Sequence, residues 1–328
     1  MKKTVLLYAF LFMAVFVAAP WIGPERVALH HVSDFLKGIS SPEGNIFWLQ
    51  RLPRVLLGLL SGGALAVVGA AFQVLFRNPL VEPFTLGVSG GASLGAFTAI
   101  AVPSLWIGWG PFSSLQLFAV TGAFLSLFLI YRLARRRGGV SVTTLLLAGV
   151  TISIICGGGI LLLTYLAHPN ALVIFQRWMM GGIDVIGYRE MISLLPLLLP
   201  GLAMIGWHAR ALNHIALGEG MALGQGVDVP RVQRDIFIGG GLATASVVSL
   251  VGPIGFVGLI VPHAVRRLSG YDQRTVVIGS FCLGGSALAA CDALARTLLA
   301  PTELPVGIIT ALVGGPIFIH LLIRRLGK

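Results

Sequence analysis

The sequence predicts an all-α polytopic membrane protein. Three observations lead to that prediction: a lipid-compatible composition, a series of apolar runs and an uneven distribution of positive charge. Of the 328 residues, 56% are hydrophobic and only 11% are charged, whereas a soluble domain carries about 25% charged residues. The mean hydropathy is +0.92. Since little of the chain is left over for a soluble domain, we expect residues 1–328 to form a single transmembrane domain.

Apolar runs follow one another along the whole chain. A helix that crosses the bilayer needs about 20 mostly apolar residues, and the eighth run is shorter than this. We retain it because both chain ends carry lysine or arginine, which favours the cytoplasm for both and requires an even number of spans. About ten transmembrane helices are therefore expected, with both termini cytoplasmic. The runs cover residues 4–22, 52–75, 86–103, 114–133, 142–166, 190–207, 236–252, 254–268, 275–295 and 306–323.

The first run follows Met1-Lys2-Lys3 and ends near Ala19-Pro20. Taken alone, such a segment is also typical of a cleaved secretory signal. Because more hydrophobic segments follow, we interpret it as the first membrane helix, with its lysines inside. A cleaved signal remains the alternative.

The 23 lysines and arginines test the ten-span arrangement. Sixteen of them fall in cytoplasmic segments and seven in external ones, as expected when positive residues stay inside. Without the eighth span, Arg324 and Arg325 would lie outside. The net charge of +11 thus has a topological explanation, and no segment is long enough to fold into a basic surface for nucleic acid.

Two connections are long enough to carry function. The external one, about 23–50, contains turn residues such as Pro24 and Asn45. The internal one, about 208–235, mixes charged residues with small apolar ones. We expect short helices there, lying along the membrane face.

Glycine spacing indicates close helix packing. Among the 43 glycines, Gly58 and Gly62, and then Gly87, Gly91 and Gly95, recur every four residues, which lets helix backbones approach closely in lipid. Flexing of the helices during transport is the alternative explanation.

Few residues in the apolar runs are able to carry chemistry, and the main ones are Gln73, Glu82, His263 and Asp292. Ionisable groups within a membrane are functional candidates because their burial is costly. Glu82 lies in a turn between two prolines and His263 lies near two arginines, so we expect both at the cytoplasmic interface. No catalytic pattern is present, and the three cysteines have no C-x-x-C spacing. We therefore predict no catalytic residue and no metal site.

A nucleotide-binding P-loop is missing. That motif, G-x-x-x-x-G-K-[ST], requires a lysine, and none of the four lysines completes it. No cofactor is therefore expected in this chain. If ATP drives the protein, another chain must bind the ATP and its Mg²⁺.

An ordered series of motifs from Arg51 onward resembles the FecCD family of permeases, which import ferric siderophores, haem and cobalamin. Each motif alone is weak evidence, whereas the ordered set is specific. The motifs are Arg51-Leu52-Pro53-Arg54, Gly69-Ala70-Ala71-Phe72-Gln73, Arg77-Asn78-Pro79-Leu80-Val81-Glu82-Pro83, Leu86–Ala92, Leu145–Val150, Trp178-Met179-Met180-Gly181-Gly182, Ala216–Glu219, Gly252–His263, Glu303-Leu304-Pro305-Val306-Gly307 and Gly314–Phe318.

The resemblance implies a type II ABC importer permease architecture in the bacterial inner membrane. It implies a second permease copy, most simply in a homodimer, with the pathway between the two. It also implies two cytoplasmic ATPase subunits and a periplasmic substrate-binding protein. The substrate, whether siderophore, haem or cobalamin, is not readable from the sequence.

Three external arginines match family positions that meet acidic residues of the binding protein: Arg51, Arg54 and Arg296. Their placement outside runs against the topological bias, and arginine suits bidentate carboxylate recognition. Anchoring to lipid headgroups is the alternative for these residues.

The resemblance also places a cytoplasmic gate at two helix connections, and it assigns Asn78 and Leu80 to one and Val142 and Thr143 to the other. Some relatives have Ser-Thr-Ser at the second gate where this chain has Ser141-Val142-Thr143, so a more apolar gate is expected.

The internal connection corresponds to the segment that presses on the ATPases. In this sequence it points to Leu217, Gly218 and Glu219 as the centre of coupling.

A different class of function, an ion-coupled secondary transporter, would need a relay of acidic groups at mid-membrane. Only Asp292 is a candidate for such a relay, and its spacing from Arg296 also predicts a local i,i+4 ion pair. A membrane-embedded enzyme is the third hypothesis, and it lacks a catalytic constellation.

Overall fold

The computed structural model describes residues 2–39, 41–102, 112–136 and 139–326, and almost all of them are helical. Short 3₁₀ or π segments (η1, Ala19–Trp21; η2, Ile46–Arg51; η3, Pro83–Leu86) adjoin the helices. The strands form one antiparallel pair, β1 (Arg135–Arg136) and β2 (Gly139–Val140). The α-helices are α1 (Lys2–Ala18), α2 (Leu29–Leu36), α3 (Pro42–Asn45), α4 (Leu52–Leu75), α5 (Val88–Ala101), α6 (Ser114–Ala134), α7 (Val142–Leu166), α8 (Pro169–Met179), α9 (Arg189–Trp207), α10 (Ala209–Leu217), α11 (Glu219–Gly224), α12 (Val229–Val251), α13 (Val257–Ser269), α14 (Gln273–Thr297) and α15 (Val306–Leu326).

Each predicted apolar run falls on one of these helices, which confirms the polytopic α-helical fold. Among the described residues, seven helical segments are long and apolar enough to cross a membrane by themselves. The helices α5 and α15 are apolar but shorter in their described parts, and α13 has 13 residues with two arginines in its last turn. The last residue of the third run, residue 103, lies outside the described residues.

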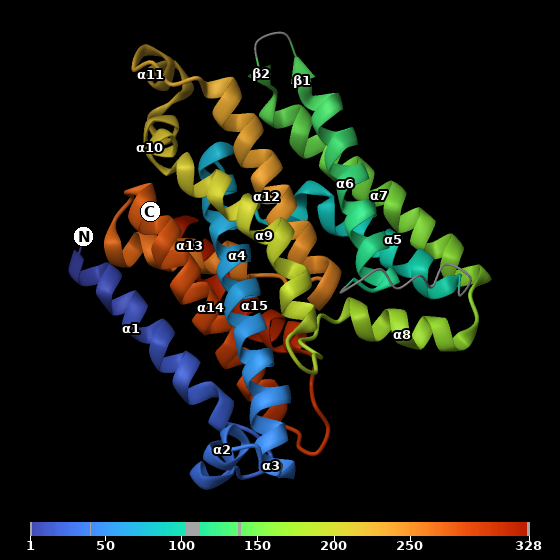
Figure 1. Cartoon of the computed structure of the whole chain (residues 1–328). Helices are drawn as coiled ribbons and strands as arrows, with labels where there is room; N and C mark the ends of the chain where they lie inside the picture. Colours follow the sequence, from blue (N-terminus) through green and yellow to red (C-terminus); the bar gives the residue numbers. More distant parts are fainter. Residues whose placement is uncertain (1, 40, 103–111, 137–138, 327–328) are drawn as a thin grey trace.

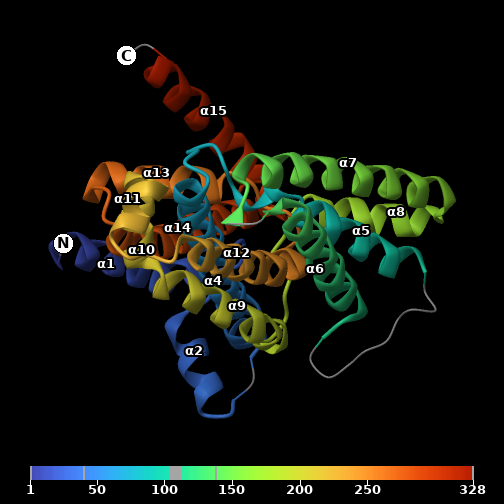
Figure 2. The same cartoon turned by 90° about the horizontal axis from the view of Figure 1, so that it is seen from above.

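The helix α4 forms the centre of the molecule (Figure 1). It is buried along nearly its whole length, and it packs against α14, α13 and α12. Figure 2 shows α9 and α12 side by side next to α4, and α5, α6 and α7 form a second packed group. A helix that is apolar on all sides is expected in such a position, because only the interior of a bundle can cover it.

Glycine allows the closest of these contacts, as the sequence indicated. A Cβ atom added at Gly69 of α4 would lie 1.9 Å from the carbonyl oxygen of Gly258 in α13. One added at Gly62 would lie 2.4 Å from the carbonyl oxygen of Gly284 in α14. Any side chain at these positions would therefore push two backbones apart.

The two long connections lie at opposite ends of the bundle. The short helices α2 and α3 occupy the end at the bottom of Figure 1, whereas α10, α11 and the β1–β2 pair lie at the top. The expected short helices of the internal connection are thus present as α10 and α11. One boundary is wrong: α12 begins at Val229, so the last residues of the predicted 208–235 loop are already helical.

The helix α8 was not expected from the apolar runs. It lies across the direction of α4 (Figure 1) and packs against α5 through Phe175, whose ring stacks on Phe97 with centroids 4.0 Å apart. This contact holds α8 against α5.

Candidate functional site

A buried charge cluster lies where the start of α4 meets the end of α14. The Arg54 Nε atom donates hydrogen bonds to Asp292 Oδ1 and Oδ2 at 2.9 and 3.1 Å, and Arg54 Nη1 donates to Glu303 Oε2 at 2.6 Å. The same Asp292 lies 3.1 Å from Arg296 Nε. Asp292 is fully buried at 0% exposure, so two arginines share a carboxylate that water does not reach.

Arg51 lies beside this cluster with partners of a different kind. Its Nη2 atom donates to the carbonyl oxygen of Glu25 at 2.6 Å, and Nη1 donates to that of Pro20 at 3.5 Å. Both hydrogen bonds go to backbone carbonyl oxygens, while the Glu25 carboxylate acts on Arg51 through space. The Arg51 side chain closely approaches Gly23, where an added Cβ would lie 2.5 Å from Nη2.

The three arginines predicted to dock a partner therefore share one end of the molecule but are not freely exposed. Their exposures are 5% for Arg51, 8% for Arg54 and 3% for Arg296. Lipid-headgroup anchoring requires a charge that reaches the surface, and this burial disfavours that alternative. The role of Asp292 as the bridge between Arg54 and Arg296 goes beyond the predicted i,i+4 pair, and Glu303 was missed as a partner of Arg54.

The predicted gate residues lie at the opposite end of α4. In the turn that follows this helix, Asn78 Oδ1 accepts a hydrogen bond from the Leu80 backbone N–H at 3.0 Å. The Leu80 side chain is 44% exposed. Val142 is the first residue of α7 and its side chain lies outside the described part, while the Thr143 side chain is exposed. Both gate segments thus present exposed groups at helix ends.

Polar groups fasten this end of α4 to α13. The Gln73 amide donates to the carbonyl oxygens of Gly258 and Leu259, both at 3.2 Å, and Arg266 donates to the Gln73 side-chain oxygen and to the carbonyl of Ala70. Buried polar groups of this kind are expected to be paired, because an unpaired one is costly in a bundle surrounded by lipid. The partners explain why Gln73 lies within an apolar helix.

Glu82 caps the start of α13. Its Oε2 atom accepts a hydrogen bond from the Phe256 backbone N–H at 3.2 Å, and burial raises the pKa of its carboxyl group despite that bond. Phe256 itself has φ of +69°, a left-handed conformation that is uncommon for a large side chain. The Glu82 side chain therefore joins the turn after α4 to the start of α13.

The predicted coupling residues lie on the turn between α10 and α11. Gly218 has φ of +135°, which reverses the chain between the two helices and suits glycine. Glu219 Oε1 accepts a hydrogen bond from Gln233 Nε2 of α12 at 3.2 Å. Three apolar side chains project from this turn, with exposures of 62% for Leu217, 58% for Met221 and 57% for Leu223. The α10–α11 region thus exposes apolar side chains and is hydrogen-bonded to α12.

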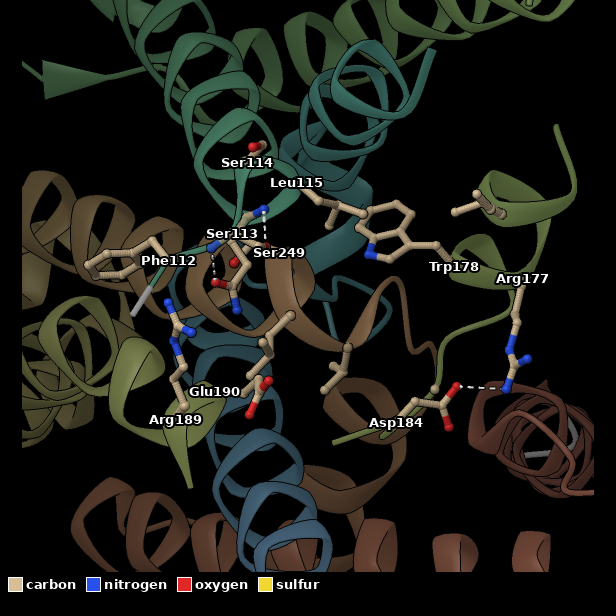
Figure 3. Close-up of a pocket in the computed structure, with 15 residues that line it drawn as sticks. Phe112, Ser113, Ser114, Leu115, Arg177, Trp178, Asp184, Arg189, Glu190 and Ser249 are labelled. Atoms are coloured by element: carbon tan, nitrogen blue, oxygen red, sulfur yellow. Dashed lines mark hydrogen bonds and ion pairs between the residues drawn. The ribbon is translucent and has the colours of Figure 1, made fainter. Parts of the chain in front are cut away.

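A hollow of about 560 Å³ lies where the starts of α6 and α9 meet α8 and the end of α12. Figure 3 shows Arg177 and Asp184 on one side, paired at 3.2 Å, and Arg189 and Glu190 on the other. Trp178 forms part of its apolar wall. The hollow therefore offers both charges and an aromatic surface, and Arg177 is one of its lining residues. Among the described residues, no cluster of histidine, cysteine or carboxylate side chains suits a metal ion.

Comparison with known proteins places this arrangement among transporters. Residues 6–324 match the FecCD transport family. The uncharacterized ABC transporter permease protein YvrB of Bacillus subtilis is 40% identical over 286 residues, which cover 86% of this chain and 79% of that protein. The cobalamin import system permease protein BtuC of Halobacterium salinarum is 39% identical over 308 residues, or 93% of this chain and 80% of that one.

A solved structure shares the fold over almost its full length. It is described as an inward-facing conformation of a metal-chelate type ABC transporter. The TM-score is 0.84 at 27% sequence identity, and the match covers 98% of both chains.

Proposed function

The chain belongs to the FecCD transport family, and from that premise we propose that it moves a cobalamin-like or iron-chelate cargo from an external binding protein into the cytoplasm. The chain is a permease subunit of an ABC importer and not an enzyme, and ATP hydrolysis takes place in separate subunits. The family match over residues 6–324 carries this conclusion, and the fold agrees with it.

Cobalamin is the first cargo to test. The supporting observation is the 39% identity to the BtuC permease over 93% of the chain. A ferric siderophore or haem is the second choice, supported by the fold shared with a metal-chelate type transporter at 27% identity.

The ion-coupled alternative finds no support in the charge cluster. A proton relay requires a carboxylate that exchanges protons with water or with the next member of the relay. Asp292 has 0% exposure and lies between two arginines at 2.9 and 3.1 Å. Two ion pairs hold this carboxylate in place, and it has no exposed surface on which to exchange a proton with water.

We place the pathway between two copies of the chain, in the inner membrane with both termini inside. The surfaces of α7 and α15 support pairing, because they expose apolar side chains such as Ile154 at 70% and Leu312 at 68%. A Cβ added at Gly157 or Gly158 of α7 would meet nothing within 4 Å, so a second backbone has room to approach. In this arrangement Leu80 and Thr143 of each copy narrow the cytoplasmic opening.

The turn around Leu217 is proposed as the contact with the ATPase. Its exposed apolar side chains suit insertion into a cleft of a soluble partner, and the Glu219–Gln233 hydrogen bond ties the turn to α12. Movement of the ATPase is thereby passed to a helix that packs against α4 and α9. At the other end of the bundle, the external arginine cluster is proposed as the docking place of the binding protein.

Cargo-stimulated ATP hydrolysis tests the proposal. The chain is reconstituted in liposomes with the ATPase and binding protein encoded beside it, and cobalamin, haem and ferric siderophores are added in turn. Stimulation by one of them supports the importer and identifies the cargo. Uptake that follows an ion gradient without any ATPase would overturn the proposal.

A paired substitution tests the coupling turn. Leu217→Asp places a charge on the projecting turn and is expected to lower ATPase co-purification at least about tenfold, as when a charge is buried unpaired at an interface. Leu29→Asp is the control, because Leu29 is 76% exposed on α2 at the opposite end. Equal loss in both variants, or loss in neither, would contradict the assignment.

A further inference from the structure

The charge cluster at this end sets three arginines against three carboxylates. Arg54 and Arg296 share Asp292, Arg54 also contacts Glu303, and the Glu25 carboxylate acts on Arg51 through space. The cluster also keeps an unused donor, because Arg296 Nη1 is buried and has no hydrogen-bond acceptor among the described residues. A buried donor without an acceptor is costly, so this end of the molecule has the character of a site for a further acceptor such as a carboxylate.

The two acids paired with Arg54 are held very differently. Asp292 is on α14 with no exposure, and it contacts two arginines. Glu303 lies on the connection between α14 and α15, and its side chain is 42% exposed with one arginine contact. Exchange with an external carboxylate is therefore possible for Glu303 and blocked for Asp292.

The Arg54 guanidinium contacts the buried acid and the exposed acid through different nitrogen atoms. Its Nε atom points to the buried Asp292, while Nη1, on the outer side of the same planar group, donates to Glu303. A planar guanidinium presents a fixed set of donors that match a carboxylate. The position of the Glu303 carboxylate is thus the position that a partner's carboxylate would take on Arg54.

From this geometry we propose that Glu303 is an internal competitor for the docking site: it occupies Arg54 in the free permease, and a carboxylate of the binding protein displaces it. This inference rests on the proposed function, because it assumes that an acidic partner docks at the arginine cluster. It also explains how arginines with exposures of 8% or less serve as a docking site. The Arg54 guanidinium stays paired with Glu303 until a carboxylate of the partner replaces Glu303 on Arg54.

The competition sets the selectivity of docking. A partner that brings no carboxylate to Arg54 must leave the Glu303 pair intact, and it gains nothing from the cluster. A partner that brings a carboxylate replaces the Arg54–Glu303 ion pair with another arginine–carboxylate pair, and the Glu303 side chain becomes hydrated. Docking strength is therefore lower than an empty arginine would provide, which favours release of the binding protein after delivery.

The test measures binding of the purified substrate-binding protein, encoded beside the permease, to the permease in lipid nanodiscs. Glu303→Gln keeps the size of the side chain and removes its charge. Loss of one charge-assisted hydrogen bond from the competitor is expected to raise affinity about tenfold or more, and to make it more dependent on salt. The matched control is Glu43→Gln, which removes a carboxylate of α3 that lies 4.0 Å from His31 and forms no ion pair with an arginine among the described residues. The control should change affinity less than about twofold, as expected for an exposed pair.

A second variant distinguishes competition for Arg54 from a purely structural role of Glu303. Glu303→Asp keeps the charge but shortens the side chain, and it should give an intermediate gain. If Glu303 serves only to hold the structure together, both variants weaken binding or leave it unchanged, and the proposal is overturned. If the wild-type permease does not bind the protein at all, the proposed function itself fails. A gain in Glu303→Gln that the Glu43→Gln control reproduces would also overturn the proposal, because general charge would then explain it.

Discussion

Replacing Gly69 with alanine tests the backbone contact on which the centre of the bundle is built. The new Cβ atom would lie 1.9 Å from the carbonyl oxygen of Gly258, whereas carbon and oxygen in such contacts stay roughly 3.3 Å apart. The helices α4 and α13 must therefore separate by about 1.4 Å at this point, the difference between the two distances. The expected result is a clear loss of stability.

The size of the loss follows from the neighbouring groups. Overpacking of this kind costs about 1–3 kcal/mol. Separation also stretches the two hydrogen bonds from Gln73 to Gly258 and Leu259, which are already 3.2 Å long, and each contributes about 1 kcal/mol. Alanine returns about 1 kcal/mol through its better helix propensity. The net destabilisation is about 2–4 kcal/mol, the sum of these terms.

Thermal unfolding of the detergent-purified protein provides the measurement. For a chain of 328 residues the unfolding entropy is roughly 0.7 kcal/mol/K, so the melting temperature should fall by about 3–6 °C. Gly206→Ala is the matched control, since a Cβ there meets nothing within 4 Å, and it should melt at or slightly above the wild-type temperature. A Gly69→Ala variant that melts together with the control would refute the close contact of α4 with α13.

Two further substitutions test the buried acids. Asp292→Asn removes the shared charge from two buried arginines and should destabilise the protein by about 3–5 kcal/mol, as for other broken buried pairs; a melting curve like that of the wild type would show that Asp292 does not bridge them. For Glu82→Gln the prediction concerns pH. Burial raises the Glu82 carboxyl pKa, so the folded state holds that proton more tightly than the unfolded state does. The associated stability is fully present below the unfolded pKa of about 4.3 and is lost as pH rises through the folded value. Glutamine can still accept from Phe256, so the variant should lose less stability than the wild type between pH 4 and pH 7, and equal losses would contradict the reasoning.

The helices were predictable because lipid leaves the chain little choice. A spanning segment must be apolar and must satisfy its own backbone hydrogen bonds, so the runs at 52–75 and 142–166 coincide with α4 and α7 to the residue. The start of α12 was missed because Arg231, Arg234 and Asp235 make its first turns polar. Its N-cap was visible in the sequence, since Asp228 accepts a hydrogen bond from the Arg231 backbone N–H at 3.1 Å.

The charge cluster was only half predictable. The i,i+4 rule connects Asp292 to Arg296 within one helix, and that pair is present at 3.1 Å. The partners of Arg54 are 238 and 249 residues away in the chain, and no periodicity connects positions so far apart. A signal for Glu303 did exist, since it begins the Glu303-Leu304-Pro305-Val306-Gly307 motif, but the motif does not say which cation it meets.

For the three arginines predicted to dock a partner, the position in the chain and the exposure of the side chain have different origins. Their predicted location at one end of the bundle followed from the order of the spans, whereas their exposures of 3–8% depend on how α1, α4 and α14 meet. Arg296 Nη2, for example, lies 3.4 Å from the carbonyl oxygen of Ala19 at the end of α1. Such burial arises from tertiary packing and leaves no trace in local sequence.

The long separation between Arg54 and its acids has a consequence for synthesis of the protein. Arg54 leaves the ribosome 238 residues before Asp292, which at roughly 5–20 residues per second is a delay on the order of 10–50 s. Throughout that interval α4 must be inserted with an arginine that has no acidic partner. Its position in the first turn of α4 makes this tolerable, because a long cationic side chain near a helix end can reach the headgroup region. When α14 is inserted, Asp292 pairs with Arg54. A segment in the last third of the chain thus supplies the acidic partner for a helix that was inserted early.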